Sequence, residues 1–377
     1  MTATLPATIP WLVISDDWGR HPTSCQHLIR RLLPEQPVTW VNMIGTRRPR
    51  LDRATLVRGW EKLGQWLRPT TAAAAAPPNL CVVSPKVWPG FRRRWERTLN
   101  RALLVRQLRP AIDAMTEAPV AITTMPTAAD LIGAVPARPW VYYCVDDFSL
   151  WPGIDQVAAR RLEDRLIDMA DVLIAVSEPL RERIALRGRS AHLLTHGVDL
   201  EFWRRADRRG SRPVVLFWGL VDRRMDSPIV RALSAALPGA TIRLVGPEDS
   251  ADPTLRQLPN VERCPGVPLA ALPDLAAEAH VLIMPYVDEP VTRAMQPLKL
   301  KEYLATGKPV VVRDLPANRA WADALDLAAT AEQFVSAVRS RLADGLPASQ
   351  ALARRRLQAE SWTQKARDFA DIIAASL

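Results

Sequence analysis

The chain has 377 residues, a length that is too great for one ordinary hydrophobic core and that is typical of two domains. Its apolar content of 48% and charged content of 24% are those of a globular protein, but its net charge of +10 favours an anionic partner: nucleic acid, an acidic membrane surface or a phosphorylated substrate. Four widely spaced cysteines argue against a disulfide framework or a zinc cluster, and neither a signal-peptide pattern nor a membrane-spanning run is found, so we expect a cytoplasmic protein that can rest at the inner face of a membrane.

Short apolar runs alternate with longer amphipathic segments in the first half of the chain. The runs predict strands and the segments between them predict helices, which is the pattern of βαβ units and a parallel sheet covered by helices. In chain order the runs are WLVIS (11–15), VTWVNMI (38–44), NLCVVS (79–84), VAITT (120–124), WVYYCV (140–145) and VLIAVS (172–177).

A second series of runs follows a polar, basic and turn-rich stretch at 193–215. Its members are PVVLFWGLV (213–221), ATIRLVGP (240–247), NVERC (260–264), HVLIMPY (280–286) and KPVVVRD (308–314). We therefore expect an α/β protein with two Rossmann-like domains, 1–194 and 195–360, and a helix at 361–377 that can pack back on the first domain. Parallel sheets bind ligands beyond the carboxyl ends of their strands, so the expected site is a cleft between the two domains.

The segment 86–110 carries seven arginines and one glutamate, with apolar residues at helical spacing. This pattern is typical of a basic helix that lies on an anionic membrane surface. The alternative is a helix that packs on its own domain and leaves a basic side in solvent.

Several common phosphate-binding patterns are missing. The chain has no GxGxxG after its first strand, no GxxxxGK[ST] and no Asp-x-Asp pair that could hold a metal ion on a diphosphate. Arginines, lysines and helix N-termini can neutralise a diphosphate instead. The second half supplies them at Arg223, Arg224, Arg293 and Lys299, and Lys299 opens a short helix expected to begin at Pro297 and to stop at Gly307.

Six segments together resemble the retaining glycosyltransferases of family 4, or group 1, which have the GT-B fold. They are SDDWGRHPTSCQHLIRRL (15–32), VYYCVDDFS (141–149), HGVDLEFW (196–203), LFWGLVDRRMD (216–226), the stretch 260–286 and VTRAMQPLKLKEYLATGKPVV (291–311). The first two look like a bacterial polysaccharide-synthesis branch of the family. The resemblance implies that a hexosyl-type sugar moves from a nucleoside-diphosphate sugar to a hydroxyl of a glycan or lipid-linked acceptor, with retained configuration and with neither a metal nor a cofactor.

The resemblance also implies roles for individual residues. Glu302 matches a glutamate that can accept hydrogen bonds from the ribose hydroxyls, and Lys299 and Arg224 match positions that stabilise the leaving diphosphate. The expected catalytic residues are Asp146, Asp147, Arg224 and Lys299; the donor-binding residues are Gly219, Arg223, Gly246, Arg293, Gln296, Pro297, Leu298 and Glu302; and the acceptor-side residues are Gly19 and Arg20. The plainer alternative for Lys299 and Glu302 is a solvated ion pair one turn apart.

The sequence departs from the family pattern at two places. Ala294 stands where the first motif glutamate usually contacts the donor sugar, with Asp288 and Glu289 nearby as substitutes. Asp146 and Asp147 stand where many relatives have a histidine, and either can be a site carboxylate or a helix cap. Ala294 also supports an alternative function, a catalytically silent protein that binds sugar nucleotides or serves in assembly. Nucleic-acid binding ranks lower, because the chain has no helix-turn-helix or RNA-binding pattern.

Overall fold

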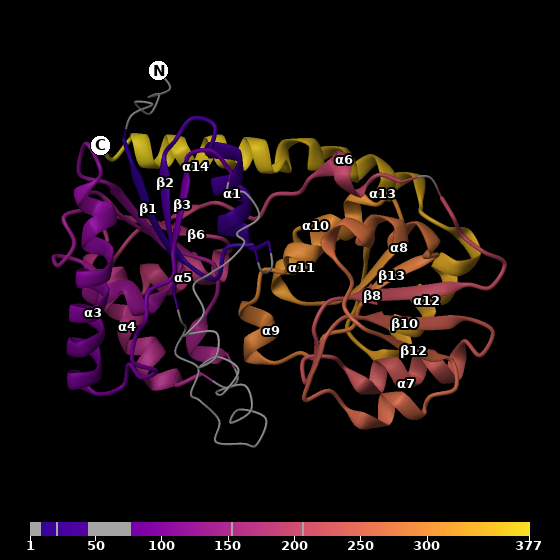
Figure 1. Cartoon of the computed structure of the whole chain (residues 1–377). Helices are drawn as coiled ribbons and strands as arrows, with labels where there is room; N and C mark the ends of the chain where they lie inside the picture. Colours follow the sequence, from indigo (N-terminus) through magenta and orange to yellow (C-terminus); the bar gives the residue numbers. More distant parts are fainter. Residues whose placement is uncertain (1–8, 20–21, 44–76, 152–153, 206) are drawn as a thin grey trace. The chain divides into compact units, whose positions relative to one another are not determined.

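The structure, a computed structural model, describes residues 9–19, 22–43, 77–151, 154–205 and 207–377 (Figure 1). The chain folds into two compact units. Unit 1 comprises Met1–Thr195 and Lys365–Leu377, and unit 2 comprises His196–Gln364.

Unit 1 is built on a seven-stranded sheet in the order β3-β2-β1-β4-β5-β6-β7, and every neighbouring pair is parallel. Its strands are β1 (Trp11–Ser15), β2 (Val38–Asn42), β3 (Leu80–Val83), β4 (Val120–Thr123), β5 (Trp140–Cys144), β6 (Val172–Ala175) and β7 (His192–Leu193). The central strands are continuous apolar runs that are buried throughout, as expected when helices cover both faces. The described helices are α1 (Ser24–Leu32), α3 (Arg94–Asp113), α4 (Gln156–Met169) and α5 (Glu178–Ala185), with short 3₁₀ turns at Pro126–Leu131 and Phe148–Leu150.

Unit 2 repeats this plan with a six-stranded parallel sheet in the order β12-β10-β8-β13-β14-β15. These strands are β8 (Val214–Trp218), β10 (Thr241–Val245), β12 (Val261–Cys264), β13 (Val281–Met284), β14 (Val310–Arg313) and β15 (Asp326–Ala328); a separate pair joins β9 (Val221–Asp222) to β11 (Glu248–Asp249). Its helices are α6 (Leu200–Trp203), α7 (Ser227–Ala236), α8 (Leu272–Glu278), α9 (Pro290–Ala294), α10 (Leu298–Ala305), α11 (Pro316–Arg319), α12 (Ala331–Asp344) and α13 (Ala348–Ala353), with 3₁₀ turns at Pro253–Gln257, Leu269–Ala271 and Arg354–Glu360. The prediction of two Rossmann-like parallel-sheet domains is confirmed.

The last helix, α14 (Trp362–Ala374), belongs to unit 2 at its start and to unit 1 from Lys365 onward. In unit 1, its Phe369 is fully buried, with its ring centroid 6.2 Å from that of Trp11 and 5.5 Å from that of Tyr143. Edge-on and tilted ring pairs of this kind contribute stabilisation beyond that of the apolar area that they bury. These contacts fix the end of the chain to the centre of the unit 1 sheet.

Two sequence expectations need small corrections. The basic segment 86–110 becomes helical only at Arg94, so Phe91, one of its apolar residues, lies before the helix, where it is buried. The helix after the donor motif begins at Leu298, because Pro297 keeps an extended backbone and serves as the N-cap. Gly307 follows its end with a φ of +76°, as expected for a helix stop.

Candidate active site

The best candidate site in unit 2 lies where the strand order reverses. The chain builds β8, β10 and β12 in one direction and then returns to place β13 on the other side of β8. In parallel sheets the loops at the carboxyl ends of two such strands diverge and leave room for a ligand. Here those loops begin at Gly219, after β8, and at Pro285, after β13.

Two glycines let the loop after β8 approach its neighbours closely. Gly219 and Gly246 have φ values of +134° and +153°, which other residues rarely adopt. A Cβ at residue 246 would lie 1.8 Å from the Gly219 carbonyl oxygen, and a Cβ at residue 219 would lie 2.0 Å from Nζ of Lys299. Only glycine therefore fits at either position.

Lys299, in the first turn of α10, directs its ammonium at the ends of both strands. Nζ donates to the Trp218 carbonyl at 3.1 Å and to the Tyr286 hydroxyl at 2.8 Å. The ammonium also lies 4.6 Å from the Phe217 ring centroid, a cation–π distance. These partners are far away in the sequence, so Lys299 is part of the tertiary structure and not simply a solvated charge on the helix.

Glu302 lies one helical turn after Lys299 and is partly buried. Burial raises the pKa of its carboxyl to about 7, although the Lys299 ammonium and the Trp218 side chain lower it. The next residue, Tyr303, anchors α10, because its hydroxyl accepts from the backbone N–H of Trp218 at 3.1 Å. The helix thus presents a cation and a proton-exchanging carboxyl beside the end of β8.

Arg224 is held inside the loop that follows β9. It is 6% exposed; its Nε lies 3.0 and 2.9 Å from the two carboxylate oxygens of Asp222, and its backbone N–H donates to the same carboxylate at 2.9 Å. One Nη donates toward Sδ of Met295 at 3.3 Å, which ties this loop to the residues before α10. Arg224 is therefore a well-fixed cation whose charge is largely balanced by Asp222.

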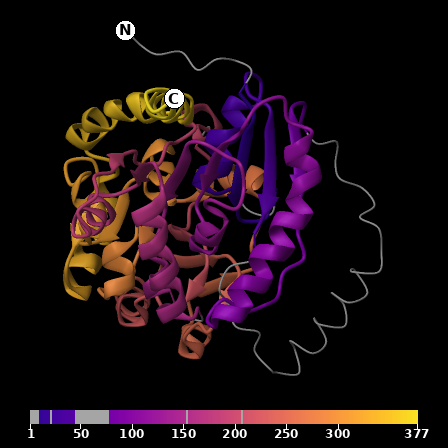
Figure 2. The same cartoon turned by 90° about the vertical axis from the view of Figure 1, so that its left-hand side faces the viewer.

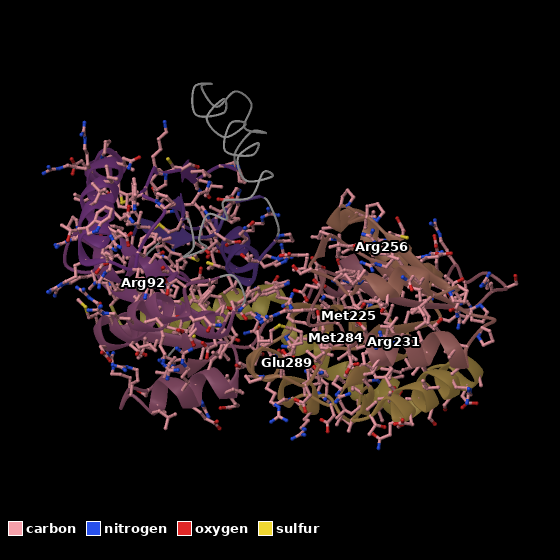
Figure 3. The ribbon with its side chains drawn as sticks, turned by 90° about the horizontal axis from the view of Figure 1, so that it is seen from below. Arg92, Met225, Arg231, Arg256, Met284 and Glu289 are labelled. Carbon is pink, nitrogen blue, oxygen red and sulfur yellow. The ribbon has the colours of Figure 1, made fainter. Side chains whose placement is uncertain are left out.

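The Arg224 loop is also joined to the loop after β13. Met225 and Tyr286 form an antiparallel bridge, and the N–H of Val287 donates to the Arg224 carbonyl at 2.8 Å. Figure 3 labels Met225 and Met284, on the two segments that meet here, and Glu289 at the start of α9. The two loops form one structure at the carboxyl edge of the sheet.

The other predicted cations of unit 2 differ in environment. Arg223 is exposed beside Arg224. Arg293 is exposed on α9 and makes a two-point ion pair with Asp288, at 2.5 and 2.9 Å, which lowers the pKa of that carboxyl. Asp288 is therefore paired with a predicted donor-binding residue, while Ala294, the last residue of α9, is partly buried.

The remaining donor-binding residues form the approach to α10. Gln296 and Leu298 are partly buried, and Pro297 is buried at the N-cap. This helix starts without a side-chain hydrogen bond from its N-cap, Pro297, and the first N–H groups of an α-helix have no intrahelical partner of the usual kind. A helix start of this kind attracts an anion.

In unit 1 the structure separates the two aspartates that the sequence left equivalent. Asp147 caps the 3₁₀ turn at Phe148–Leu150 by accepting from the Ser149 N–H at 3.0 Å, and it lies 2.8 Å from the Arg183 guanidinium. Arg183 also pairs at 2.6 Å with Glu163, which is fully buried and accepts from the Tyr142 hydroxyl. Asp147 thus has the capping arrangement, and Asp146, which follows β5 one residue earlier, becomes the better candidate for a site carboxylate.

The loop after β1 holds the acceptor-side candidates. Gly19 has a φ of +81°, and its N–H donates to the Gln26 side chain at 3.1 Å; Arg20 lies outside the described residues. Asp16, at the start of this loop, accepts from the hydroxyls of Ser15 and Thr23 at 3.0 and 3.2 Å, and burial raises its pKa. A carboxyl placed just after the first strand was the available signal for it.

Sequence alone does not identify which side chains hold the predicted residues in place. Tyr286 and Trp218 position Lys299, Asp222 positions Arg224, and Arg183 positions Asp147. Trp218, Asp222 and Tyr286 lie at or just after the end of an apolar run, and this position was the available sequence signal for them. Within the described ranges, no three His, Cys, Asp or Glu side chains gather as a metal site, and no helix is long and apolar enough to cross a membrane.

Comparisons with known proteins agree with this architecture. Residues 212–344 match the family Glycosyl transferases group 1. A Bacillus subtilis protein described as a putative teichuronic acid biosynthesis glycosyltransferase, TuaH, is 30% identical over 175 residues, which cover 42% of this chain and 44% of that protein. The match therefore spans less than half of the length of this relative.

Solved structures are similar over nearly the whole chain. The Anabaena protein HepE in complex with UDP and glucose gives a TM-score of 0.66 at 15% identity, with 98% of this chain and all of that chain covered. An Escherichia coli structure described as trehalose-6-phosphate bound with UDP-2-fluoro glucose gives 0.70 at 13% identity, covering 98% of this chain and 99% of that one. At such identities the likeness establishes the fold alone. The group 1 glycosyltransferase match thus lies within unit 2, and the solved structures share the fold of both units.

Proposed function

We propose that this protein transfers a sugar from a nucleoside-diphosphate sugar to an acceptor hydroxyl. One observation carries the proposal: Lys299 and Glu302 lie one turn apart on α10, at the carboxyl ends of the two strands where the unit 2 sheet reverses its order. The group 1 match covers this region, and two of the structural neighbours are described as complexes with UDP or a UDP-sugar. UDP is therefore the first nucleotide to test.

The site residues contact different parts of the proposed donor. The ionised Glu302 carboxylate accepts hydrogen bonds from the two ribose hydroxyls, and the start of α10 with Lys299 faces the diphosphate. As the bond between the anomeric carbon and the diphosphate oxygen breaks, negative charge builds on the diphosphate. The Lys299 ammonium and the Arg224 guanidinium stabilise that charge more strongly than they stabilise the bound donor, which is the condition for a faster reaction.

We assign retention of configuration and independence of metals to this reaction. The acceptor oxygen bonds to the anomeric carbon on the side from which the diphosphate departs, and its proton passes to the departing phosphate oxygen. Fixed cations on α10 and on the Arg224 loop serve the role that a divalent ion would otherwise serve. The anomeric configuration of the product, read by NMR, and turnover in a chelator test the two assignments separately.

The acceptor is proposed to be a glycan or a lipid-linked glycan used in cell-surface polysaccharide synthesis. The Bacillus relative is described as a putative glycosyltransferase of teichuronic acid biosynthesis. The net charge of +10 on this chain suits an anionic acceptor or surface. Asp146 is the carboxylate we assign to the acceptor hydroxyl or to the positive charge that develops at the anomeric carbon.

The test starts with thermal shifts of the full chain in UDP, GDP, TDP and their sugars, followed by turnover of the donors that stabilise it. Glu302→Ala should raise the dissociation constant of the stabilising nucleotide, and Lys299→Met should mainly lower turnover. Glu332→Ala, at an exposed glutamate of the same unit, is the matched control. Wild-type binding and turnover in both site variants would show that the site lies elsewhere.

A second candidate is a catalytically silent protein that binds sugar nucleotides, since Ala294 replaces the usual sugar-contacting glutamate and Asp288 is occupied by Arg293. Nucleotide stabilisation without turnover of any donor, in the presence of acceptor extracts, would favour this reading. Glu289, exposed at the N-cap of α9, is then the residue to examine next.

A further inference from the structure

The helix α3 of unit 1 has an unusual distribution of polar and apolar side chains. Leu104 and Leu108 are buried against the sheet of unit 1, but the face turned away from them carries Trp95 and Leu99, which are 50% and 39% exposed. Residues 95, 99, 102 and 106 follow one another at helical spacing, so the apolar pair continues into Ala102 and Arg106. Figure 2 shows α3 along its length at the side of unit 1.

A second tryptophan is fixed against this face. Trp88, 46% exposed, lies with its ring centroid 5.6 Å from that of Trp95. Its backbone N–H donates to the Asn100 side chain at 2.7 Å, and the Asn100 amide donates to the carbonyls of Trp88 and Gly90 at 3.1 and 2.8 Å. Asn100 is itself 1% exposed, so a buried amide holds an exposed aromatic in place.

A second amide side chain, two turns further along α3, also bonds to the backbone of the preceding segment. Gln107 accepts from the Lys86 N–H at 2.8 Å and donates to the Lys86 carbonyl at 2.8 Å. Two amide side chains of α3, those of Asn100 and Gln107, therefore hold the preceding segment against the helix. The helix itself is held in unit 1 by a two-point ion pair of Arg97 with Asp130, at 2.8 and 2.6 Å. The exposed tryptophans therefore lie on segments that several side-chain hydrogen bonds hold in place.

Cations surround this apolar centre. Arg92, Arg93 and Arg94 are exposed at the start of α3, and Arg106 is exposed three turns after Trp95. The nearby acid, Glu96, is used internally, because it accepts from the Arg93 N–H at 2.7 Å. Arg92, labelled in Figure 3, also lines a cavity of about 270 Å³ together with Phe91 and Arg93.

We propose that Trp88, Trp95, Leu99, Arg92, Arg93, Arg94 and Arg106, called here the aromatic–basic surface, bind an anionic lipid bilayer. Indole rings prefer the headgroup level of a membrane, where their apolar body and polar N–H are both satisfied, and the arginines are attracted by anionic headgroups. A nucleic acid would be served by the arginines, but it would leave Leu99 without an apolar partner. The proposal does not depend on sugar transfer, because vesicle binding requires no turnover.

The test uses the full chain and vesicles of phosphatidylglycerol and phosphatidylcholine, with vesicles of phosphatidylcholine alone as reference. The wild type should co-sediment with the anionic vesicles, and less so at high salt, which screens the arginines. Replacing three arginines together (Arg92→Gln, Arg93→Gln, Arg94→Gln) should lower the partition coefficient roughly 100-fold, since each basic residue near an anionic surface multiplies the affinity about fivefold.

A second variant tests the apolar centre. The double variant Trp88→Ala with Trp95→Ala removes both indole rings without changing the charge, and it should lower vesicle binding. Its melting temperature should stay close to the wild-type value, because both rings are about half exposed. The matched control removes three exposed arginines of unit 2 (Arg204→Gln, Arg208→Gln, Arg212→Gln) and should bind vesicles nearly as well as the wild type.

Three outcomes would overturn the proposal. The first is equal binding to neutral and anionic vesicles, and the second is a loss in the unit 2 control as large as the loss in the α3 variant. The third is undiminished vesicle binding by the double tryptophan variant. Binding of a random single-stranded oligonucleotide that both α3 variants lose, without any vesicle binding, would assign the surface to nucleic acid instead.

Discussion

The Lys299 ammonium occupies the space that a side chain at residue 219 would need. A Cβ there would lie 2.0 Å from Nζ, although the two residues are 80 positions apart in the sequence. The absence of a side chain at Gly219 is thus what allows Lys299 to reach the Trp218 carbonyl and the Tyr286 hydroxyl.

Gly219→Ala should therefore displace Lys299 and weaken nucleotide binding. The new methyl group also forces alanine into a strained backbone with a φ of +134°, so we expect a loss of about 1–3 kcal/mol in the free energy of unfolding. The dissociation constant for UDP, measured by calorimetry, should rise roughly tenfold if one contact of about 1.4 kcal/mol is lost. Gly239→Ala is the control, because a Cβ at residue 239 meets nothing within 4 Å; equal UDP affinity in the two variants would contradict the role of Lys299.

Glu302 should make the stability of the protein depend on pH. Its pKa is about 7 in the folded chain, against an ordinary value of 4.5, so between these pH values the folded state keeps a proton that the unfolded state has lost. The contribution of this group to stability is therefore largest below pH 4.5 and falls as pH rises through 7. Glu302→Gln removes the titration, so its melting temperature relative to the wild type should increase from pH 5 to pH 8. A difference that is constant with pH would show that the carboxyl titrates normally.

The same titration predicts proton release on nucleotide binding. If the ribose hydroxyls donate to an ionised Glu302, UDP binding near pH 6 must remove the proton that burial retains. Calorimetry in buffers of different ionisation enthalpy should detect this proton in the wild type and not in Glu302→Gln. Wild-type UDP affinity should also increase as pH rises from 6 to 8.

Arg224 and Asp222 should separate stability from turnover. Removing the arginine alone leaves the 8%-exposed Asp222 carboxylate without its partner, so Arg224→Ala should cost about 3–5 kcal/mol of stability. The double variant Asp222→Asn with Arg224→Met removes both charges and should recover most of that stability. If Arg224 stabilises the leaving diphosphate, the double variant should still turn over slowly. Recovery of turnover along with stability would assign a purely structural role to the pair.

The two aspartates after β5 should give opposite results. Asp147→Ala removes a cap and the ion pair with Arg183, so it should lower the melting temperature, with loss of the cap alone costing about 0.5–2 kcal/mol. Asp146→Asn should keep the melting temperature nearer to the wild type and reduce turnover of the donor. Thermal melts and steady-state kinetics on both variants check this, and a fully active Asp146→Asn variant would remove that residue from the proposed mechanism.

Some properties of this protein can be read from local sequence because they depend on local physics. The alternation of buried apolar runs with amphipathic segments specifies parallel strands and covering helices, and the short motif around Lys299 and Glu302 predicts a helix whose expected start differs by one residue from the observed start at Leu298. The spacing of Lys299 and Glu302 by one turn is a property of any α-helix, so their common placement on α10 also follows from sequence.

Other properties depend on residues that meet only after folding. The ion pair of Asp147 is formed with Arg183, on a different helix, and the reach of Lys299 is decided by a glycine 80 positions away. Trp95 is exposed and Phe91 is buried, although the two aromatic residues are only four positions apart. Hydrogen bonds and burial between distant segments carry no periodic signal in the sequence, and only the tertiary structure determines them.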